Sequence, residues 1–361
     1  MILKEFRELR RDRRTVAMLV VLPLLLLTIF GFAANFTVGT LTAVAVGPGA
    51  EAAAQGLAAG SEAAGQGGAG GATAGAAVTL DVRAVRPDDA RADAVADLAA
   101  NRYDLGVVTA ADGSTPEVLV DGSNLFAAQA ARVVLAQLGD AVRTTILFNP
   151  DLTTAWVMVP ALIGLILTFI GTIITSIGLV KERAAGTLEQ LAVMPLRPVD
   201  VIVGKIAPYF LLASIDMVVV TLLGRWIFDV PFVGSIGVFA LAAAVFLLVV
   251  LGLGVLISTV SQNAGQAIQT AILVLLPQIL LSGFIFPLDA MAPGVRWIGY
   301  CLPMTYFVQV SQGVMLRGAG LDSLWLPITV LVAMAVLVFG AAVWRFRASI
   351  TPRRPRAAVA R

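Results

Sequence analysis

Histidine is absent from the 361 residues, and Cys301 is the only cysteine. Without histidine the chain cannot build a Ser-His-Asp triad, a zinc site of the His-Glu-x-x-His type or a histidine proton relay. A single cysteine excludes any disulfide within the chain. The nucleophile-elbow pattern Gly-x-Ser-x-Gly is missing as well. We therefore expect a protein that is not an enzyme by itself.

Charged residues are also scarce, at 13 % of the chain, whereas about 25 % is usual in soluble domains. Hydrophobic residues make up 58 %. A helix needs about 20 apolar residues to cross roughly 30 Å of hydrocarbon. Six stretches meet this requirement, if the long uncharged region is divided at the polar turn 258–266. They are residues 15–36, 155–180, 206–225, 234–257, 267–287 and 324–344.

Lysine and arginine gather at the two ends of the chain, in residues 1–14 and in the tail 347–361. Cytoplasmic segments carry the excess of these residues, so both termini are predicted to be cytoplasmic in a plasma (inner) membrane. The basic ends then contact membrane lipid and no nucleic acid, with 1–14 as an amphipathic helix. A cleaved signal peptide is the alternative for the first span. However, the apolar run is longer than that of a usual signal peptide, and cleavage would leave an odd number of spans.

The segment 37–151 is net acidic and lies outside the membrane in this topology. Its patterns predict a small α+β domain inserted between the first two spans. The expected strands are 41–46, 78–85, 103–109 and 117–120, and the expected helices are 87–100 and 125–148. Residues 47–77 are almost entirely glycine and alanine, which favours a flexible tract over an Ala-rich helical hairpin.

Two groups of carboxylates raise the question of a site. Four aspartates on the helix 87–100 could bind calcium, but a solvated helix face is the favoured explanation, and no metal site is predicted. Asp216 lies within the third span, where an ionisable group is costly. Asp216 could be a proton-coupling or substrate-contact residue. We favour the alternative that it is a structural hydrogen-bond acceptor for Thr221, Gln269 or Gln278.

The segment 181–205 is a charged island between two apolar runs, and it predicts a short amphipathic helix followed by Pro-Leu-Arg-Pro. An ordinary solvated loop helix would have the same composition. However, the run K-E-R-x-x-G-T-L-E-Q-L-x-V-x-P-L-x-P-x-x-x-x-x-G-K-I-x-P-Y, residues 181–209, closely resembles the cytoplasmic signature of ABC-2 type (type V exporter-like) permeases, which carry a large external domain after the first transmembrane helix.

Residues 281–317 resemble the same family, in which this region forms two short helices that re-enter the membrane from outside. The residues that carry this resemblance are Ser-Gly-Phe-Ile-Phe before Pro287, then Trp297, Pro303 and Tyr306, so 288–318 is predicted to be the re-entrant outer segment. Prolines suit such helix breaks. Asp121-Gly122-Ser123-Asn124 resembles the end of the family's external domain.

The resemblance implies an all-α membrane domain of six helices. The first helix is 15–36 and the other five belong to residues 152–346. The domain would act as a dimer with a second copy or a related permease. It also implies that the segment 181–205 docks on a separate ATPase. The coupling residues would be Glu182, Arg183, Gly186, Thr187, Glu189 and Gln190, with the two glutamates as charge partners or Arg183 pairing within the loop. The pattern Gly-x4-Gly-Lys-Ser/Thr is absent, so ATP and Mg would be bound by the partner and no cofactor by this chain.

The function implied is outward transport of a hydrophobic or amphipathic compound, such as a drug-like molecule or a lipid. Two alternatives remain open. One is an ion-coupled secondary transporter that uses Asp216, although no inverted repeat of interrupted helices is evident. The other is a non-transporting membrane anchor for the external domain, which would leave the cytoplasmic signature without a purpose.

Overall fold

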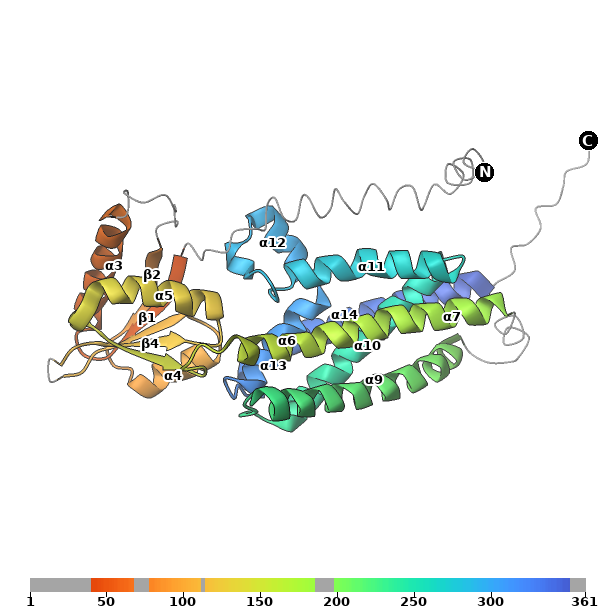
Figure 1. Cartoon of the computed structure of the whole chain (residues 1–361), viewed down its shortest axis with the longest axis horizontal. Helices are drawn as coiled ribbons and strands as arrows, with labels where there is room; N and C mark the ends of the chain where they lie inside the picture. Colours follow the sequence, from red (N-terminus) through yellow and green to blue (C-terminus); the bar gives the residue numbers. More distant parts are fainter. Residues whose placement is uncertain (1–39, 68–77, 112–113, 186–197, 351–361) are drawn as a thin grey trace, which may run out of the picture.

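The computed structural model describes residues 40–67, 78–111, 114–185 and 198–350. Figure 1 shows an α/β domain at one end of an elongated bundle of helices. The helix predicted at 1–14 and the span predicted at 15–36 lie outside the described residues. The same holds for residues 351–361 of the predicted tail.

The α/β domain is built on one five-stranded sheet in the order β2-β1-β3-β4-β5. Neighbouring strands are parallel except for the antiparallel pair β3 and β4. Parallel neighbours need crossover connections, which the helices supply. The strands are β1 Thr40–Val46, β2 Thr79–Arg86, β3 Leu105–Val108, β4 Glu117–Asp121 and β5 Arg143–Leu147, and the helices are α3 Ala50–Gly67, α4 Arg91–Ala99 and α5 Leu125–Leu138.

The central strand β1 is covered on both faces. Leu41 and Ala43 pack in one cluster with residues of α3 and α5, while Val44 packs in another with Leu98 of α4. A strand buried on both sides reads as a continuous apolar run, as this one does. The parallel pairs with helical crossovers make the domain α/β, and the prediction of an α+β arrangement is corrected in this respect.

The prediction of a flexible tract over 47–77 is wrong for the helix α3. Its buried residues Ala50, Ala54 and Leu57 recur at the spacing of one helix face and pack against the sheet. Burial of that face outweighs the low helix propensity of the glycines, because most helical stability in proteins comes from packing. Residues 68–77 lie outside the described part of the chain.

The prediction of one long helix over 125–148 is also wrong. Helix α5 starts at the predicted N-cap, where the Asn124 side chain accepts a hydrogen bond from the amide of Ala127, but it ends at Leu138. Gly139 has a positive φ of 55°, which favours glycine and stops the helix. A short 3-10 helix, η1 Gly139–Ala141, follows, and then the edge strand β5, which pairs in parallel with β4.

Five helical stretches of the described residues are long and apolar enough to cross a membrane: Thr154–Ala184, Ile206–Phe228, Ile236–Val260, Ala264–Leu281 and Leu321–Arg345. The first is built from α6 Thr154–Phe169, the π-helical turn η2 Ile170–Ile174 and α7 Thr175–Ala184, and the others belong to α9 Pro198–Phe228, α10 Ile236–Val260, α11 Ala264–Leu281 and α14 Leu321–Ile350. They correspond to the second to sixth predicted spans.

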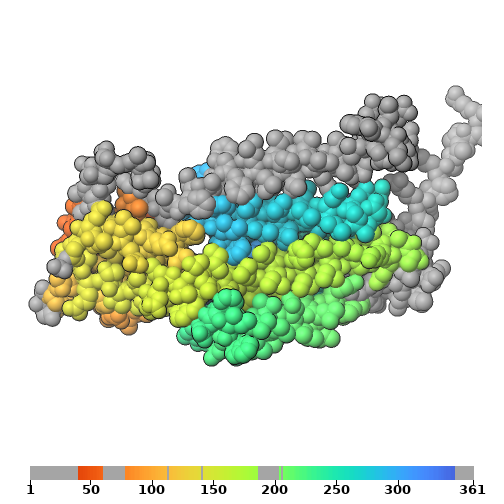
Figure 2. Space-filling model, viewed as in Figure 1, coloured from red at the N-terminus to blue at the C-terminus, as the bar shows by residue number. Residues whose placement is uncertain are grey.

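Helix α10 is the centre of the bundle and contacts α7, α13 and α14. In contrast, α9 lies along one side of the bundle (Figure 2) and exposes a long apolar surface that includes Leu211, Ile215 and Leu222. Such a surface suits a lipid environment.

Glycines allow the closest approaches in the bundle. A Cβ atom on Gly164 of α6 would lie 2.6 Å from the ring of Phe307, which stacks on Phe246 with a centroid distance of 4.5 Å. A Cβ on Gly254 of α10 would lie 2.7 Å from the carbonyl oxygen of Gly171 in η2. Small residues are common where membrane helices meet.

Three short helices occupy the end of the bundle beside the α/β domain (Figure 1): η3 Leu288–Ala290, α12 Pro293–Tyr300 and α13 Pro303–Met315. Pro293 and Pro303 stand at the first position of their helices, where the missing amide costs no hydrogen bond.

Candidate functional site

The predicted ATPase-coupling residues divide into two groups. Glu182 and Arg183 belong to the last turn of α7, at the end of the bundle far from the α/β domain (Figure 1). The Nη1 of Arg183 donates a hydrogen bond of 3.4 Å to the carbonyl oxygen of Ser261, the residue that caps α10. The end of α7 is thereby tied to the end of the central helix. The remaining residues, Gly186, Thr187, Glu189 and Gln190, lie outside the described part of the chain.

Asp216 lies half-buried in α9, and its Oδ2 atom is buried without a hydrogen-bond partner among the described residues. Two of its predicted partners, Thr221 and Gln278, do not bond to it. The hydroxyl of Thr221 donates to the carbonyl of Met217 in its own helix, and both amide atoms of Gln278 lack a partner within the described residues. The predicted hydrogen bonds from these two side chains to the Asp216 carboxylate are therefore wrong.

The four residues singled out between 281 and 317 do not form a single cluster. Pro287 precedes η3 and lines a cavity, whereas the Trp297 side chain on α12 is 73 % exposed. Pro303 starts α13, and the Tyr306 hydroxyl donates a hydrogen bond of 2.7 Å to the carbonyl of Tyr300 at the end of α12. Pro287, Pro303 and Tyr306 thus lie at the connections between the short helices, and Trp297 does not.

A buried polar junction joins this segment to the α/β domain. Arg317 follows α13, and its Nη1 donates to Asn101 Oδ1 at 2.9 Å and to Ser123 Oγ at 3.1 Å. The same nitrogen lies 3.6 Å from Asp121 Oδ2, and both side chains are at least 95 % buried. Asp121 Oδ1 accepts hydrogen bonds from the backbone amide and the hydroxyl of Ser123. One guanidinium thus connects the bundle to two loops of the domain.

Burial governs the electrostatics of the junction. It raises the pKa of the Asp121 carboxyl, while the charge of Arg317 and the hydrogen bonds from Ser123 oppose that rise. A buried pair of this kind is stable only while both partners are present, because each alone would be an uncompensated charge.

The turn after β4, residues 121–124, also holds the chain segment that leads into α6. The Asn149 side chain donates to the carbonyl oxygens of Gly122 and Thr153 and accepts a hydrogen bond of 2.9 Å from the amide of Thr153. A Cβ on Gly122 would lie 2.7 Å from the carbonyl oxygen of Leu147. Glycine is therefore required where β4 meets the chain that leaves the sheet for the bundle.

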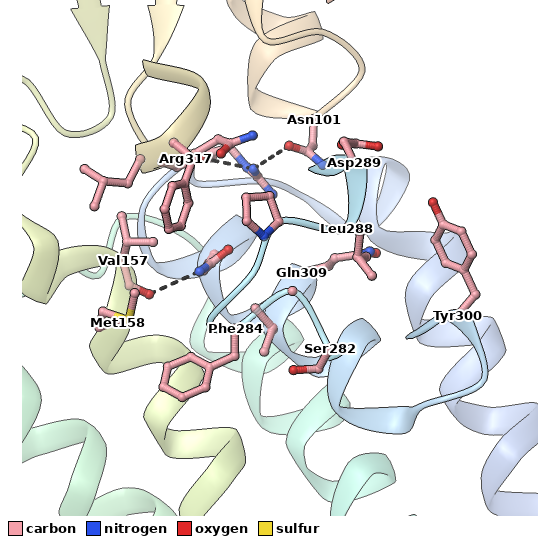
Figure 3. A pocket seen from close by; sticks show the side chains of 18 residues that line it. Asn101, Val157, Met158, Ser282, Phe284, Leu288, Asp289, Tyr300, Gln309 and Arg317 are labelled. Atoms are coloured by element: carbon pink, nitrogen blue, oxygen red, sulfur yellow. Dashed lines mark hydrogen bonds between the residues drawn. The ribbon is translucent and has the colours of Figure 1, made fainter. Parts of the chain in front are cut away.

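A cavity of about 220 Å³ opens beside the junction, between the α/β domain and the helices (Figure 3). Arg317 and Asn101 lie at its domain side, and Ser282, Phe284 and Leu288 at its bundle side. Gln312 lines it as well and donates from Nε2 to the carbonyl oxygen of Val157 at 3.1 Å.

Sequence reasoning gave no role to Arg317, Asn101 or Asn149. The signal available for Arg317 was its place as the last residue of the matched segment 281–317, a charged side chain in an apolar neighbourhood. Asn101 has a positive φ of 56°, a conformation that asparagine tolerates better than most residues, but the sequence does not reveal this.

Together, the apolar helices and the domain at one end of the bundle define a multi-pass membrane protein. A family model described as "ABC-2 family transporter protein" matches residues 13–344. The chain belongs to the ABC-2 transporter family, and the resemblance drawn from residues 181–209 and 281–317 is confirmed.

Several bacterial relatives carry names of transport permeases. The chain is 29 % identical over 250 residues to "probable multidrug ABC transporter permease YbhR" of Escherichia coli, covering 65 % of this chain and 68 % of that protein. It is 34 % identical to "probable multidrug ABC transporter permease YbhS" and to "inner membrane transport permease YhhJ" of the same organism, over 55 % and 58 % of this chain. It spans 53 % and 56 % of the lengths of those two relatives.

Proposed function

We propose that this chain is the membrane-spanning permease subunit of an ATP-driven exporter whose ATPase is a separate subunit. The observation that carries the proposal is the family match over residues 13–344, and the names of the bacterial relatives agree with it. The chain itself contains no Gly-x4-Gly-Lys-Ser/Thr pattern, so the proposal assigns the binding of ATP and Mg to the partner.

The proposed topology has six spans in the inner membrane, with the first at 15–36 and both termini in the cytoplasm. The α/β domain then lies outside, between the first two spans. Five apolar helices and the position of the domain directly before α6 support this arrangement. A second copy or a related permease completes the translocation unit.

The proposed ATPase contact is the segment that starts at the end of α7. Glu182 and Arg183 lie at the end of the bundle opposite the α/β domain, as a cytoplasmic contact requires (Figure 1). The hydrogen bond from Arg183 to the last turn of α10 links this segment to the centre of the bundle. A displacement of this segment by the ATPase would thus be transmitted to α10. Glu182 and Glu189 would supply charges that make the contact specific for this partner.

The test is co-purification from the native membrane in mild detergent, followed by mass spectrometry. We expect the wild-type chain to bring down an ATPase with a Walker A motif, and the Glu182→Ala, Glu189→Ala double variant to lose it. The matched control replaces two exposed carboxylates of the α/β domain, Asp81→Ala and Asp88→Ala, and should retain the ATPase. An ATPase retained by the first double variant would contradict the proposed contact, and none with the wild type would contradict the subunit assignment.

The proposed cargo is a hydrophobic or amphipathic compound, either drug-like or a lipid. The word "multidrug" in the names of two relatives supports this class. The apolar character of the spans agrees with a cargo that enters from the bilayer.

A second candidate function is ion-coupled secondary transport. The observation that favours it is the buried Oδ2 of Asp216, which has no hydrogen-bond partner among the described residues. Intramembrane carboxylates often serve as coupling sites. If transport is ion-coupled, Asp216→Asn abolishes it. If the chain is part of an ATP-driven exporter, ATP hydrolysis remains in Asp216→Asn.

A further inference from the structure

One π-helical turn interrupts the helical stretch Thr154–Ala184. The turn is η2 Ile170–Ile174, which lies between α6 and α7 along the bundle (Figure 1). A π turn closes i→i+5 hydrogen bonds where an α turn closes i→i+4 bonds, so it holds one residue more than a regular helix needs. Such turns are rare and are found frequently at functional sites. Here the turn lies in the helix that leads to the proposed ATPase contact.

Two buried hydroxyl groups set this turn apart from the rest of the helix. Thr172 and Thr175 are 0 % exposed, and their Oγ1 atoms have no hydrogen-bond partner among the described residues. The hydroxyls on either side of them are paired: Thr168 and Ser176 donate to backbone carbonyl oxygens of their own helix at 2.7 and 2.9 Å. A buried hydroxyl without a partner destabilises the conformation that contains it, because its lost hydration is not replaced.

An uninterrupted α-helix would give both hydroxyls an acceptor. Threonine in a helix can donate to the carbonyl oxygen four residues earlier, which belongs to Thr168 in the case of Thr172 and to Gly171 in the case of Thr175. The α form of the turn gains these two hydrogen bonds, but it requires α7 to repack. Each form thus has a stabilising feature that the other lacks, as is expected of an element with two conformations.

The two halves of the span are anchored differently. Helix α6 contributes Val159, Ile163 and Leu167, among others, to the largest apolar cluster of the bundle. In contrast, the buried residues Leu179 and Val180 of α7 belong to two small clusters. A change in the turn should therefore leave α6 in place and move α7.

The contact of the turn with the central helix α10 is made at a glycine. A Cβ atom on Gly254 would lie 2.7 Å from the carbonyl oxygen of Gly171 and 2.9 Å from the Cβ of Thr175. Since glycine has no side chain, α10 does not interlock with the turn at this position. Rotation of the helix past Gly254 is therefore not blocked by a side chain at that residue.

We propose that η2 changes between π and α geometry when the ATPase displaces the segment after α7. Loss of the extra residue from the turn moves α7 by one residue relative to α6, a rotation of about 100° and a shift of about 1.5 Å along the axis. Arg183 then leaves the carbonyl oxygen of Ser261, its present acceptor. Thr172 and Thr175 favour this step, because their hydroxyls gain partners in the α form. The inference rests on the proposed transport function and assigns a conformational step to it.

The test measures this movement with spin labels on the full chain, purified with its ATPase in phospholipid nanodiscs. All variants carry Cys301→Ser, so the introduced cysteines are the only ones in the chain. The first pair, Ala184→Cys and Gln262→Cys, joins the exposed ends of α7 and α10. The control pair, Thr154→Cys and Ser235→Cys, joins the exposed starts of α6 and α10. Electron paramagnetic resonance gives both distances without nucleotide and with ATP plus vanadate.

We expect ATP plus vanadate to produce a second distance for the first pair alone. A side chain about 5 Å from the helix axis moves by about 8 Å in a rotation of 100°. The control pair should keep one distance, because α6 stays in place.

The double variant Thr172→Val, Thr175→Val tests the role of the hydroxyls. Valine has the shape of threonine without the unpaired hydroxyl, so the π form is stabilised. We expect the thermal midpoint without nucleotide to rise, and the fraction of chains at the second distance to fall about fivefold or more.

The matched control is Thr168→Val, Ser176→Ala in the same labelled chain. These two hydroxyls are buried beside the turn but already donate to carbonyl oxygens. Their loss should not raise the thermal midpoint, and the second distance should remain populated.

Three results would overturn the inference: ATP hydrolysis without a second distance for the first pair, an equal change in both pairs, or a fraction at the second distance that Thr172→Val, Thr175→Val does not lower. Each of them, obtained with steady ATP hydrolysis, leaves the proposed function intact. Absence of an ATPase from the purified wild type overturns the proposed function, and the driven movement of α7 with it.

Discussion

The junction between the α/β domain and the bundle depends on a few buried side chains. Arg317 reaches Asn101, Ser123 and Asp121 from the end of α13, and Asn149 holds the start of α6 against Gly122. Apart from Asn101, which is exposed, each of these residues is buried, so its partners are fixed by the fold. Changes to single residues should therefore have large effects here.

Arg317→Met should destabilise the chain strongly, because it leaves Asp121 buried without its countercharge. Breaking a buried pair in this way typically costs about 3–5 kcal/mol. The double variant Arg317→Met, Asp121→Leu should recover much of this loss, since neither charge remains. Thermal unfolding in detergent measures both effects. A double variant as unstable as the sum of the two single variants would show that the pair is not coupled.

The stability of the chain should depend on the protonation of Asp104. Burial raises the pKa of this carboxyl, and repulsion from Asp289 adds to the rise, although Thr42 and Asn124 donate hydrogen bonds to it. The folded chain then binds the proton more tightly than the unfolded chain, whose aspartate pKa is about 3.9. Stability from this group is therefore lost as pH rises from about 4 through the folded pKa.

The measurement compares thermal midpoints of the wild type and Asp104→Asn over this pH range. The difference should move in favour of Asp104→Asn as pH rises. Asp81→Asn, an exposed carboxylate in the same domain, serves as the control. A constant difference between Asp104→Asn and the wild type would refute the assigned direction.

At the scale of elements, the packing of α10 against η2 depends on Gly254. A Cβ there would approach the backbone oxygen of Gly171 to 2.7 Å and the Cβ of Thr175 to 2.9 Å, and a backbone atom cannot move aside easily. Gly254→Ala should therefore destabilise the bundle by about 1–3 kcal/mol, the usual cost of overpacking.

The matched control is Gly340→Ala in α14, where no described atom lies within 4 Å of the added methyl group. Alanine is the better helix former by about 1 kcal/mol, so this variant should be neutral or stabilising. Thermal unfolding of both variants gives the comparison. Equal midpoints for Gly254→Ala and Gly340→Ala would contradict the close contact between α10 and η2.

The elements that periodicity predicted well are those with an unambiguous apolar pattern. The strand at 41–46 and the spans from 155 onward belong to this group, since their runs are long or flanked by clear turns. Helix α3 escaped prediction because its stabilising contacts come from the sheet. Strand β5 escaped because Thr144, Thr145 and Ile146 form a short edge strand whose partner β4 lies more than 20 residues earlier.

At the scale of the whole molecule, the sequence predicted the family but not the junction. Local motifs carried the resemblance, and the family match over 13–344 confirmed it. Asp121 and Arg317 are 196 positions apart in the sequence, and only the fold brings them into contact. The predicted coupling residues 186–190 lie outside the described part of the chain, so their role stays a prediction.

The central claim is that a separate ATPase drives this chain, and ATP hydrolysis in proteoliposomes tests it most directly. The measurement uses material purified through a tag on the chain. We expect steady ATP hydrolysis with the wild type, its loss in the Glu182→Ala, Glu189→Ala variant, and its persistence in Asp216→Asn. The account would be contradicted if the wild type showed no ATP hydrolysis while a proton gradient drove transport that Asp216→Asn abolished.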